Sequence, residues 1–347
     1  GLSRETDASN TKNDVVVNYN EADLENLNLY LGQADDRLFV DSTISGTTKI
    51  IANGGSDRIL ATDIYGDVTI EGDSSTQSFS EQADFIYVQN VKANANLIIS
   101  AQRGDDVIDI NTIEAGTGSV SIYGEEGDDQ IRVSNANADL TIYGDAKDSN
   151  NEGGAYSDQD RVYLENVNVA QRGDSSEGVQ VYTEGDDDEL YLRNSSDIAE
   201  TLLNTGNTGS GRDFVKIGAE APSQWISYLT ELTADHSADR SVILAGLTDA
   251  LEATNVENAG NLDDLHGTIN VAGVDLAKNN YLEINDDLNT AGRALVLENN
   301  KISVVHAADT AEINYTTIDF LNIFTGSGDD QIDVVSTNAT TDTFILS

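Results

Sequence analysis

A parallel β-solenoid is the fold class that this sequence predicts, and three observations support it. The tripeptide Gly-Asp-Asp recurs before short strands of alternating polarity, at Gly104–Ile110, Gly127–Val133 and Gly328–Val334. Looser copies of the acidic turn bring the spacing between acidic positions to 21–31 residues from Asp36 to Asp213. A repeat of this length that is built from strands is typical of a solenoid, whose successive coils stack on one another.

Within one repeat the sequence predicts two or three short strands joined by polar corners. The strand that follows the acidic turn at 127–129 places Ile131 and Val133 on one face and polar residues on the other. A polar corner and a second strand, Leu140–Tyr143, come next. Stacked coils would bury these apolar faces in one continuous core. We expect equivalent inward positions for Ile59, Ile108 and Ile131.

The composition limits the partners of the chain. Its 347 residues include 62 acidic and 18 basic residues, which gives a formal net charge of −44. Nucleic acid and anionic membranes attract basic proteins, so we expect neither as a partner. The chain has no cysteine, which excludes disulfides, and it has no apolar run of membrane-spanning length. It also lacks methionine, so we expect a processed protein or a piece of a longer one.

The repeat pattern stops after about Gly218, where apolar residues begin to recur at helical spacing. The residues concerned are Trp225, Leu229 and Leu232, followed by Ile243, Leu247 and Leu251. We therefore divide the chain into a leading segment (1–18), right-handed parallel solenoid coils (19–218), an insertion with two short helices (219–292) and coils that open a next repeat module (293–347).

A second repeat is much longer. The segments 19–43 and 313–337 share a tyrosine, an alternating strand, an acidic turn and a second strand, and their anchors Asp36 and Asp330 lie 294 residues apart. We expect the two segments to occupy the same structural step. This indicates either an excerpt from a tandem array or a subunit whose ends stack on copies of itself.

The acidic turns resemble the calcium-binding nonapeptide of repeats-in-toxin proteins, Gly-Gly-x-Gly-x-Asp-x-U-x, in which U is a large apolar residue. Thr325–Asp333 and Thr208–Lys216 match all but its first glycine, and Gly124–Arg132 lacks the second. In that family, aspartates and backbone carbonyls of successive turns hold Ca²⁺. The family's nonapeptides run contiguously, whereas here one such turn occurs per coil.

The stretch from Tyr281 to Val335 also resembles the junction between β-solenoid modules of very large bacterial surface and adhesin-like proteins. This resemblance covers most of the chain at the level of its pattern. It implies an extracellular location at the cell surface and an architecture more than a defined activity.

Calcium is the cofactor that the acidic turns suggest. Stacked coils would bring carboxylates to within about 5 Å of each other, and Ca²⁺, with six to eight oxygen ligands, would relieve their repulsion. The alternative is that these aspartates cap turns by accepting backbone N–H groups. The candidate ligands are Asp35, Asp36, Asp105, Asp106, Asp128, Asp129, Asp187, Asp188, Asp213, Asp329 and Asp330.

The sequence favours a structural or adhesive spacer stiffened by calcium, and two alternatives remain. One is a self-assembling filament or surface-layer subunit, whose partners would be copies of itself rather than neighbouring modules. The other is a β-helical polysaccharide lyase or hydrolase, with extracellular polysaccharide as partner. We assign no catalytic residue, and the three histidines show no metal-ligand spacing. For Tyr65, Tyr123 and Tyr143, a structural ladder is favoured over a sugar-binding row.

Overall fold

In a computed structural model the chain is all-β throughout the residues that it describes. These residues are 2–4, 15–17, 24–73, 82–145, 159–169, 178–183, 187–195, 200–204, 213–218, 261–273 and 280–346. No helix occurs within these ranges, and so none of membrane-spanning length and apolarity is found there. The two helices expected between Trp225 and Leu251 lie outside the described residues.

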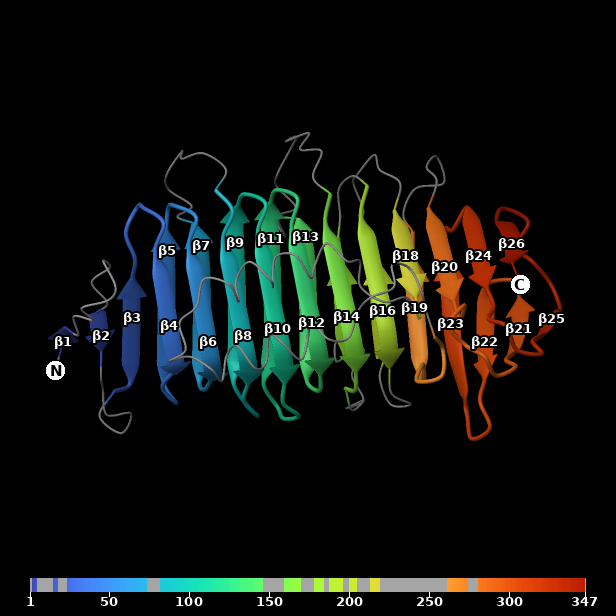
Figure 1. The fold of residues 1–347 in the computed structure, drawn as a ribbon, viewed down its shortest axis with the longest axis horizontal. Helices are drawn as coiled ribbons and strands as arrows, with labels where there is room; N and C mark the ends of the chain where they lie inside the picture. Colours follow the sequence, from blue (N-terminus) through green and yellow to red (C-terminus); the bar gives the residue numbers. More distant parts are fainter. Residues whose placement is uncertain are drawn as a thin grey trace.

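Two long sheets form the body of the molecule, and the chain alternates between them as it advances along the long axis (Figure 1). Neighbouring strands in each sheet come from successive coils and pair in parallel, apart from one antiparallel excursion near the C-terminus. This arrangement confirms the predicted parallel β-solenoid, with two described strands per coil.

The eleven-stranded sheet contains, in chain order, β4 (Arg37–Ser42), β6 (Arg58–Ile64), β8 (Phe85–Val91), β10 (Val107–Ile113), β12 (Gln130–Ala136), β14 (Arg161–Val167), β16 (Glu189–Ser195), β18 (Phe214–Ile217), β20 (Tyr281–Asn285), β24 (Phe320–Phe324) and β26 (Asp342–Leu346). The thirteen-stranded sheet contains β3 (Asn26–Tyr30), β5 (Thr47–Asn53), β7 (Asp67–Asp73), β9 (Asn96–Arg103), β11 (Ser119–Glu126), β13 (Asp139–Asp145), β15 (Val179–Tyr182), β17 (Glu200–Asn204), β19 (Thr268–Ala272), β21 (Ala294–Glu298), β22 (Lys301–Val305), β23 (Thr310–Thr316) and β25 (Gln331–Val334). A separate antiparallel pair joins β1 (Leu2–Arg4) to β2 (Val15–Val17).

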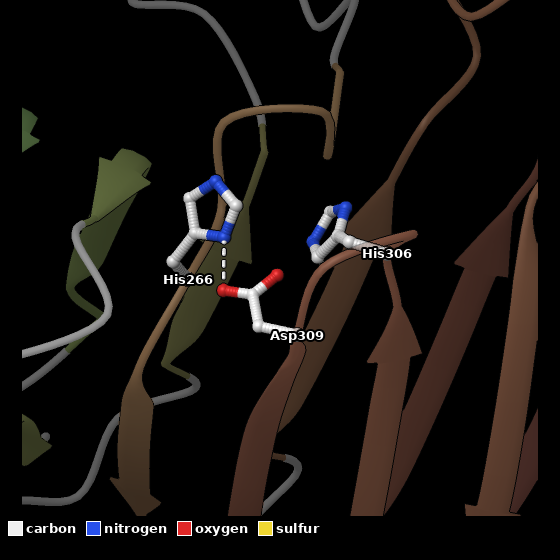
Figure 2. Close-up of side chains that lie close together, drawn as sticks. All are labelled: His266, His306 and Asp309. Atoms are coloured by element: carbon white, nitrogen blue, oxygen red, sulfur yellow. Dashed lines mark hydrogen bonds and ion pairs between the residues drawn. The ribbon is translucent and has the colours of Figure 1, made fainter.

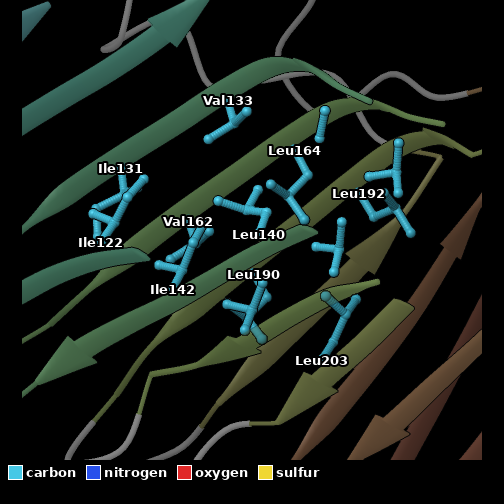
Figure 3. Packing of buried hydrophobic residues seen from close by; sticks show 14 of the residues in the cluster. Ile122, Ile131, Val133, Leu140, Ile142, Val162, Leu164, Leu190, Leu192 and Leu203 are labelled. Atoms are coloured by element: carbon cyan, nitrogen blue, oxygen red, sulfur yellow. The ribbon is translucent and has the colours of Figure 1, made fainter. Parts of the chain in front are cut away.

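The core lies between the two sheets and runs along the stack. Ile59, Ile86, Ile108 and Ile131 follow one another in a single column of the eleven-stranded sheet, and all are at most 1% exposed. The equivalent inward positions expected for Ile59, Ile108 and Ile131 are thus confirmed. Figure 3 shows how Ile, Leu and Val side chains from both sheets fill the interior. Alternation along each strand places these residues inward, because successive side chains of a strand point to opposite faces.

Ladders of identical side chains support the register of the coils. Asn166 donates from Nδ2 to Asn135 Oδ1 at 3.0 Å, and Asn194 donates to Asn166 Oδ1 at 2.9 Å. On the other sheet the ring of Tyr143 stacks on Tyr123 and Tyr182, with centroids 5.4 and 5.0 Å apart. A one-residue slip of any coil would break these contacts, since it would turn every side chain to the other face.

The boundaries assigned to the insertion need correction. The strands β19 and β20 lie within 219–292, yet they pair in parallel with β17 and β18 and belong to the two sheets. The coils therefore resume before residue 293. Near the C-terminus, β21, β22 and β23 form an antiparallel meander within the thirteen-stranded sheet.

The long internal repeat also proves different from expectation. The first copy runs from β3 in the thirteen-stranded sheet to β4 in the eleven-stranded sheet, whereas the second runs from β24 in the eleven-stranded sheet to β25 in the thirteen-stranded one. The order of strand, acidic turn and strand is the same, but the sheets are exchanged. The two segments are therefore not the same structural step, since the acidic turn lies at opposite corners of the coil.

Candidate functional site

The acidic turns line up at the corner where the chain passes from the thirteen-stranded to the eleven-stranded sheet. The aspartate that ends each turn directly precedes a strand of the eleven-stranded sheet, and the parallel register places it beside its counterparts in the next coils. We call these aspartates the inner row. The inner row consists of Asp36, Asp57, Asp84, Asp106, Asp129, Asp160, Asp188 and Asp213.

One hydrogen bond per coil links the members of the inner row. Asp106 accepts the backbone N–H of Asp84 on Oδ1 at 2.6 Å, and it donates its own N–H to Asp129 Oδ1 at 2.8 Å. The same bond recurs from Asp36 to Asp213 at 2.6–3.4 Å. From Asp57 onward, each carboxylate therefore caps the turn of the preceding coil, which is the alternative that the sequence left open.

The inner row is deeply buried from Asp57 onward. Asp57, Asp106 and Asp160 are each 1% exposed, and their Oδ2 atoms have no hydrogen-bond partner among the described residues. Burial raises the pKa of Asp57 to about 7 and that of Asp84 to about 8. For Asp106 and Asp160, burial and the charge of Asp129 raise the pKa well above its ordinary value.

In four of the eight turns a second aspartate directly precedes the inner-row residue, and we call these four residues the outer row: Asp35, Asp105, Asp128 and Asp187. Asp35, Asp105 and Asp128 are exposed, and Asp187 is half-buried. Asp105 Oδ1 accepts the N–H of Asp128 at 3.1 Å, and Asp128 Oδ1 accepts that of Gln159 at 2.8 Å. These residues also cap turns, but their carboxylates face solvent.

Asp329 and Asp330 do not join either row. Their turn leads into β25 of the thirteen-stranded sheet, at the opposite corner of the coil. Asp330 Oδ1 accepts the N–H of Arg293 at 2.9 Å, and Asp329 is exposed. The nine other candidate ligands that the sequence singled out are thus brought together in the two rows, and these two are not.

The two rows differ in how well they suit Ca²⁺, which needs six to eight oxygen ligands at 2.3–2.6 Å. In the inner row, Oδ1 already holds a backbone N–H, and Oδ2 packs against the facing strand. A Cβ placed on Gly72 would lie 2.5 Å from both Asp84 Oδ2 and Ala101 O, which leaves no space for a coordination shell. The outer row, with exposed carboxylates one coil apart, fits a calcium ion better.

A cluster that sequence reasoning missed lies beside the described segment 261–273. His266 precedes β19, and His306 and Asp309 form the turn between β22 and β23 (Figure 2). His266 Nδ1 lies 2.8 Å from Asp309 Oδ2, and the two imidazole rings are 4.7 Å apart. The histidines are 40 residues apart in the chain, so only the antiparallel meander brings them together.

The hydrogen bonds of this cluster argue against a metal ion, although its three side chains could approach one. His306 Nδ1 lies 3.2 Å from Arg293 Nη1, which can only donate, so Nδ1 must accept. The proton of His306 is then on Nε2, where it is donated to Leu265 O at 2.7 Å. Arg293 is itself held by Asp263 and Asp286. We therefore interpret the cluster as a hydrogen-bonded joint between the meander and the coil.

The basic residues beside the acidic turns are engaged in ion pairs. Arg103 pairs with Glu126 at 3.0 Å, and Arg193 pairs with Glu165 at 2.8 Å. Arg132 points away from the core but is only 6% exposed, and it lies 3.6 Å from Glu165. Arg132 and Arg193 therefore balance the charge of Glu165.

The tyrosine row is a structural ladder in its central part. Tyr123 and Tyr143 stack face to face, together with Tyr182, which the sequence analysis did not include. Tyr65 lies in the turn between β6 and β7 and is not part of this stack. The rings cover each other's faces, which are the surfaces that a sugar would need.

The fold and its two aspartate rows define a two-sheet parallel β-solenoid with capped acidic corners. Comparison of the sequence with protein-family models, with curated proteins and with solved structures returned no match.

Proposed function

We propose that this chain is a rigid spacer segment of an extracellular bacterial surface protein. The observation that carries the proposal is the unbroken stack: eleven strands of one sheet follow each other over a single core, with hydrogen-bonded side-chain ladders between coils. At about 4.8 Å per strand the stack is about 50 Å long. Because each coil contacts only its neighbours, such a body can be extended without changing its cross-section.

The acidic surface supports a location in saline or calcium-containing surroundings. A formal charge of −44 opposes a compact state through self-repulsion, and cations relieve that repulsion. The outer row offers carboxylates to such cations, and those of Asp105 and Asp128 are exposed and lie in successive coils. Calcium at the outer row would then stiffen the corner at which the coils are joined.

Two measurements test the spacer proposal. Small-angle X-ray scattering of the purified chain should give an elongated particle of constant cross-section. Antibodies raised against the chain should label intact producing cells. Labelling that requires permeabilised cells would refute the surface location, and a globular scattering profile would refute the rod.

The role of calcium is tested separately by thermal unfolding in millimolar Ca²⁺ and in excess chelator. A ligand that binds only the folded state at 100 times its Kd stabilises it by about 2.7 kcal/mol. The double variant Asp105→Asn/Asp128→Asn should lose much of the calcium-dependent shift. Asp333→Asn is the control, since it removes an exposed carboxylate outside the acidic turns. Equal shifts in the two variants would rule out the outer row as the calcium site.

Assembly of copies end to end is a second candidate, and the exposed edge strands favour it. Val334 and Val335, at the end of β25, are 51% and 66% exposed, and Phe344 and Leu346 of β26 are 51% and 49% exposed. An unpaired strand edge with apolar side chains is a template for another strand. Sedimentation that depends on protein concentration, and that Val335→Lys abolishes, would support the filament. A monomer at all concentrations would exclude it.

A further inference from the structure

Asn280 occupies a position that is equivalent to those of the inner-row aspartates. Tyr281 pairs with Phe214 on one side and with Phe320 on the other, so Asn280 stands in the row between Asp213 and Asp319. Asn280 is 2% exposed, and its N–H donates to Asp319 Oδ2 at 3.0 Å, as the aspartates do along the row. A neutral side chain with the shape of aspartate therefore fits this position.

The amide nitrogen Nδ2 of Asn280 occupies the place that Oδ2 has in an aspartate, so its contacts show what surrounds this atom. Nδ2 donates to the backbone carbonyl of Thr317 at 3.1 Å. The Thr317 carbonyl belongs to the next coil and lies beside Gly273, which directly follows β19. A Cβ added to Gly273 would lie 2.7 Å from Asn280 Nδ2. Asn280 Nδ2 thus lies next to a glycine and a carbonyl oxygen, and this oxygen can only accept a hydrogen bond.

Asp84 and Asp160 place Oδ2 in the same environment. A Cβ on Gly72 would lie 2.5 Å from both Asp84 Oδ2 and Ala101 O of the next coil. A Cβ on Gly144 would collide with Asp160 Oδ2 and lie 3.0 Å from Thr183 O. An ionised carboxylate has no proton to offer these carbonyls, whereas a carboxylic acid has one O–H donor. Protonation would therefore reproduce the bond that Asn280 makes.

We propose that the inner-row aspartates Asp84 and Asp160 are neutral carboxylic acids near neutral pH, and that each donates Oδ2–H to a backbone carbonyl of the facing strand. The row then links the coils twice, through the N–H that Oδ1 accepts and through the O–H that Oδ2 donates. It makes the solenoid sensitive to alkali. This inference does not depend on the spacer function or on calcium at the outer row.

The negative charges around the inner row also raise the pKa values of its aspartates. Burial is the main cause of the raised pKa values, and the carboxylates of Asp73 at the end of β7 and Asp145 at the end of β13 add to it. At the first coils Asp35 and Asp36 do so as well. Burial raises the pKa of Asp73 itself to about 6, against the opposing charge of Arg103.

The sign of the pH dependence follows from these pKa directions. An aspartate in the unfolded chain loses its proton near pH 4. In the folded row, burial raises the pKa of Asp84 to about 8 and that of Asp160 well above its ordinary value. In this window the folded state binds more protons, so stability is greatest at low pH and falls as pH rises. Each aspartate that is protonated in the folded state and ionised in the unfolded state raises the equilibrium constant of unfolding tenfold per pH unit.

The test combines carbon-13 spectra of aspartate carboxyl groups with chemical unfolding between pH 5 and pH 9. We expect carboxyl signals in the parent protein that remain those of the protonated acid at pH 6. Asp84→Asn keeps the acceptor and supplies a fixed donor, so it should remove one such signal. It should also reduce the pH dependence of the unfolding constant by one tenfold step per pH unit. Asp333→Asn, which removes an exposed carboxylate outside the row, should keep the parental dependence.

The spectra of the parent protein decide the matter even if Asp84→Asn fails to fold. Carboxyl signals that all titrate near pH 4 would overturn the proposal. So would inner-row carboxylates that are ionised at pH 6 and shift on addition of Ca²⁺, because a cation would then take the place of the protons. A folded Asp84→Asn protein with the parental pH dependence would overturn it as well.

Discussion

Replacing Ile131 by alanine tests the inward register of the coils most directly. Ile131 is fully buried, and its column neighbours are Ile108 in the preceding coil and Val162 in the following one. The change removes about three carbon groups, worth about 0.8 kcal/mol each in transfer free energy. The cavity that remains adds to this cost, because packed neighbours relax only in part. We expect the free energy of unfolding to fall by about 3–4 kcal/mol.

The control for this prediction is the same substitution on the outer face of the other sheet. Ile98 is 44% exposed, so Ile98→Ala should cost less than about 1 kcal/mol. Urea unfolding followed by circular dichroism measures both variants. Hydrogen exchange should show the loss of protection at Ile131→Ala concentrated in β10, β12 and β14, since coils interact mainly with their neighbours. Equal costs for the two variants would refute the register on which the core depends.

Further predictions concern the corners and ladders. Tyr143→Leu removes ring stacking on both sides and should cost about 1–3 kcal/mol by urea unfolding; a stability unchanged from the parent would show that the stack only fills space. Gly144→Ala should cost about 1–3 kcal/mol, because the new Cβ collides with Asp160 Oδ2. Gly54→Ala is its control, since nothing lies closer than Asp73 Oδ1 at 3.9 Å, and a similar cost for both would contradict the crowding of the inner row. Asn166→Ala leaves Asn135 and Asn194 without their ladder bonds and should cost about 1–3 kcal/mol, whereas a neutral effect in the same assay would mean that water replaces the ladder.

The sequence by itself determined the fold class and the core. Alternation along a strand fixes which side chains share a face, so Ile108 and Ile131 could be placed inward from their spacing alone. The recurring acidic turn fixed where each coil begins. Local turn chemistry also allowed the capping role of the aspartates to be foreseen, because aspartate readily accepts backbone N–H groups.

The tertiary structure decided which aspartate of each turn is buried. Asp105 and Asp106 are adjacent and chemically identical, yet Asp105 is exposed whereas Asp106 is buried, with 1% of its surface exposed. The difference arises because the second residue lies between the two sheets, opposite the small residues of the facing strand. No pattern within a single repeat specifies that facing strand.

Contacts between distant segments were also beyond the reach of the sequence. His266 and His306 lie close together because β21, β22 and β23 reverse direction within one sheet. The same antiparallel meander precedes the second copy of the long repeat, in which the strands before and after the acidic turn lie in exchanged sheets. A strand–turn–strand phrase is encoded locally by its alternation and its turn residues. The sheet in which each strand pairs depends on the path that the chain has already taken, which only the assembled stack determines.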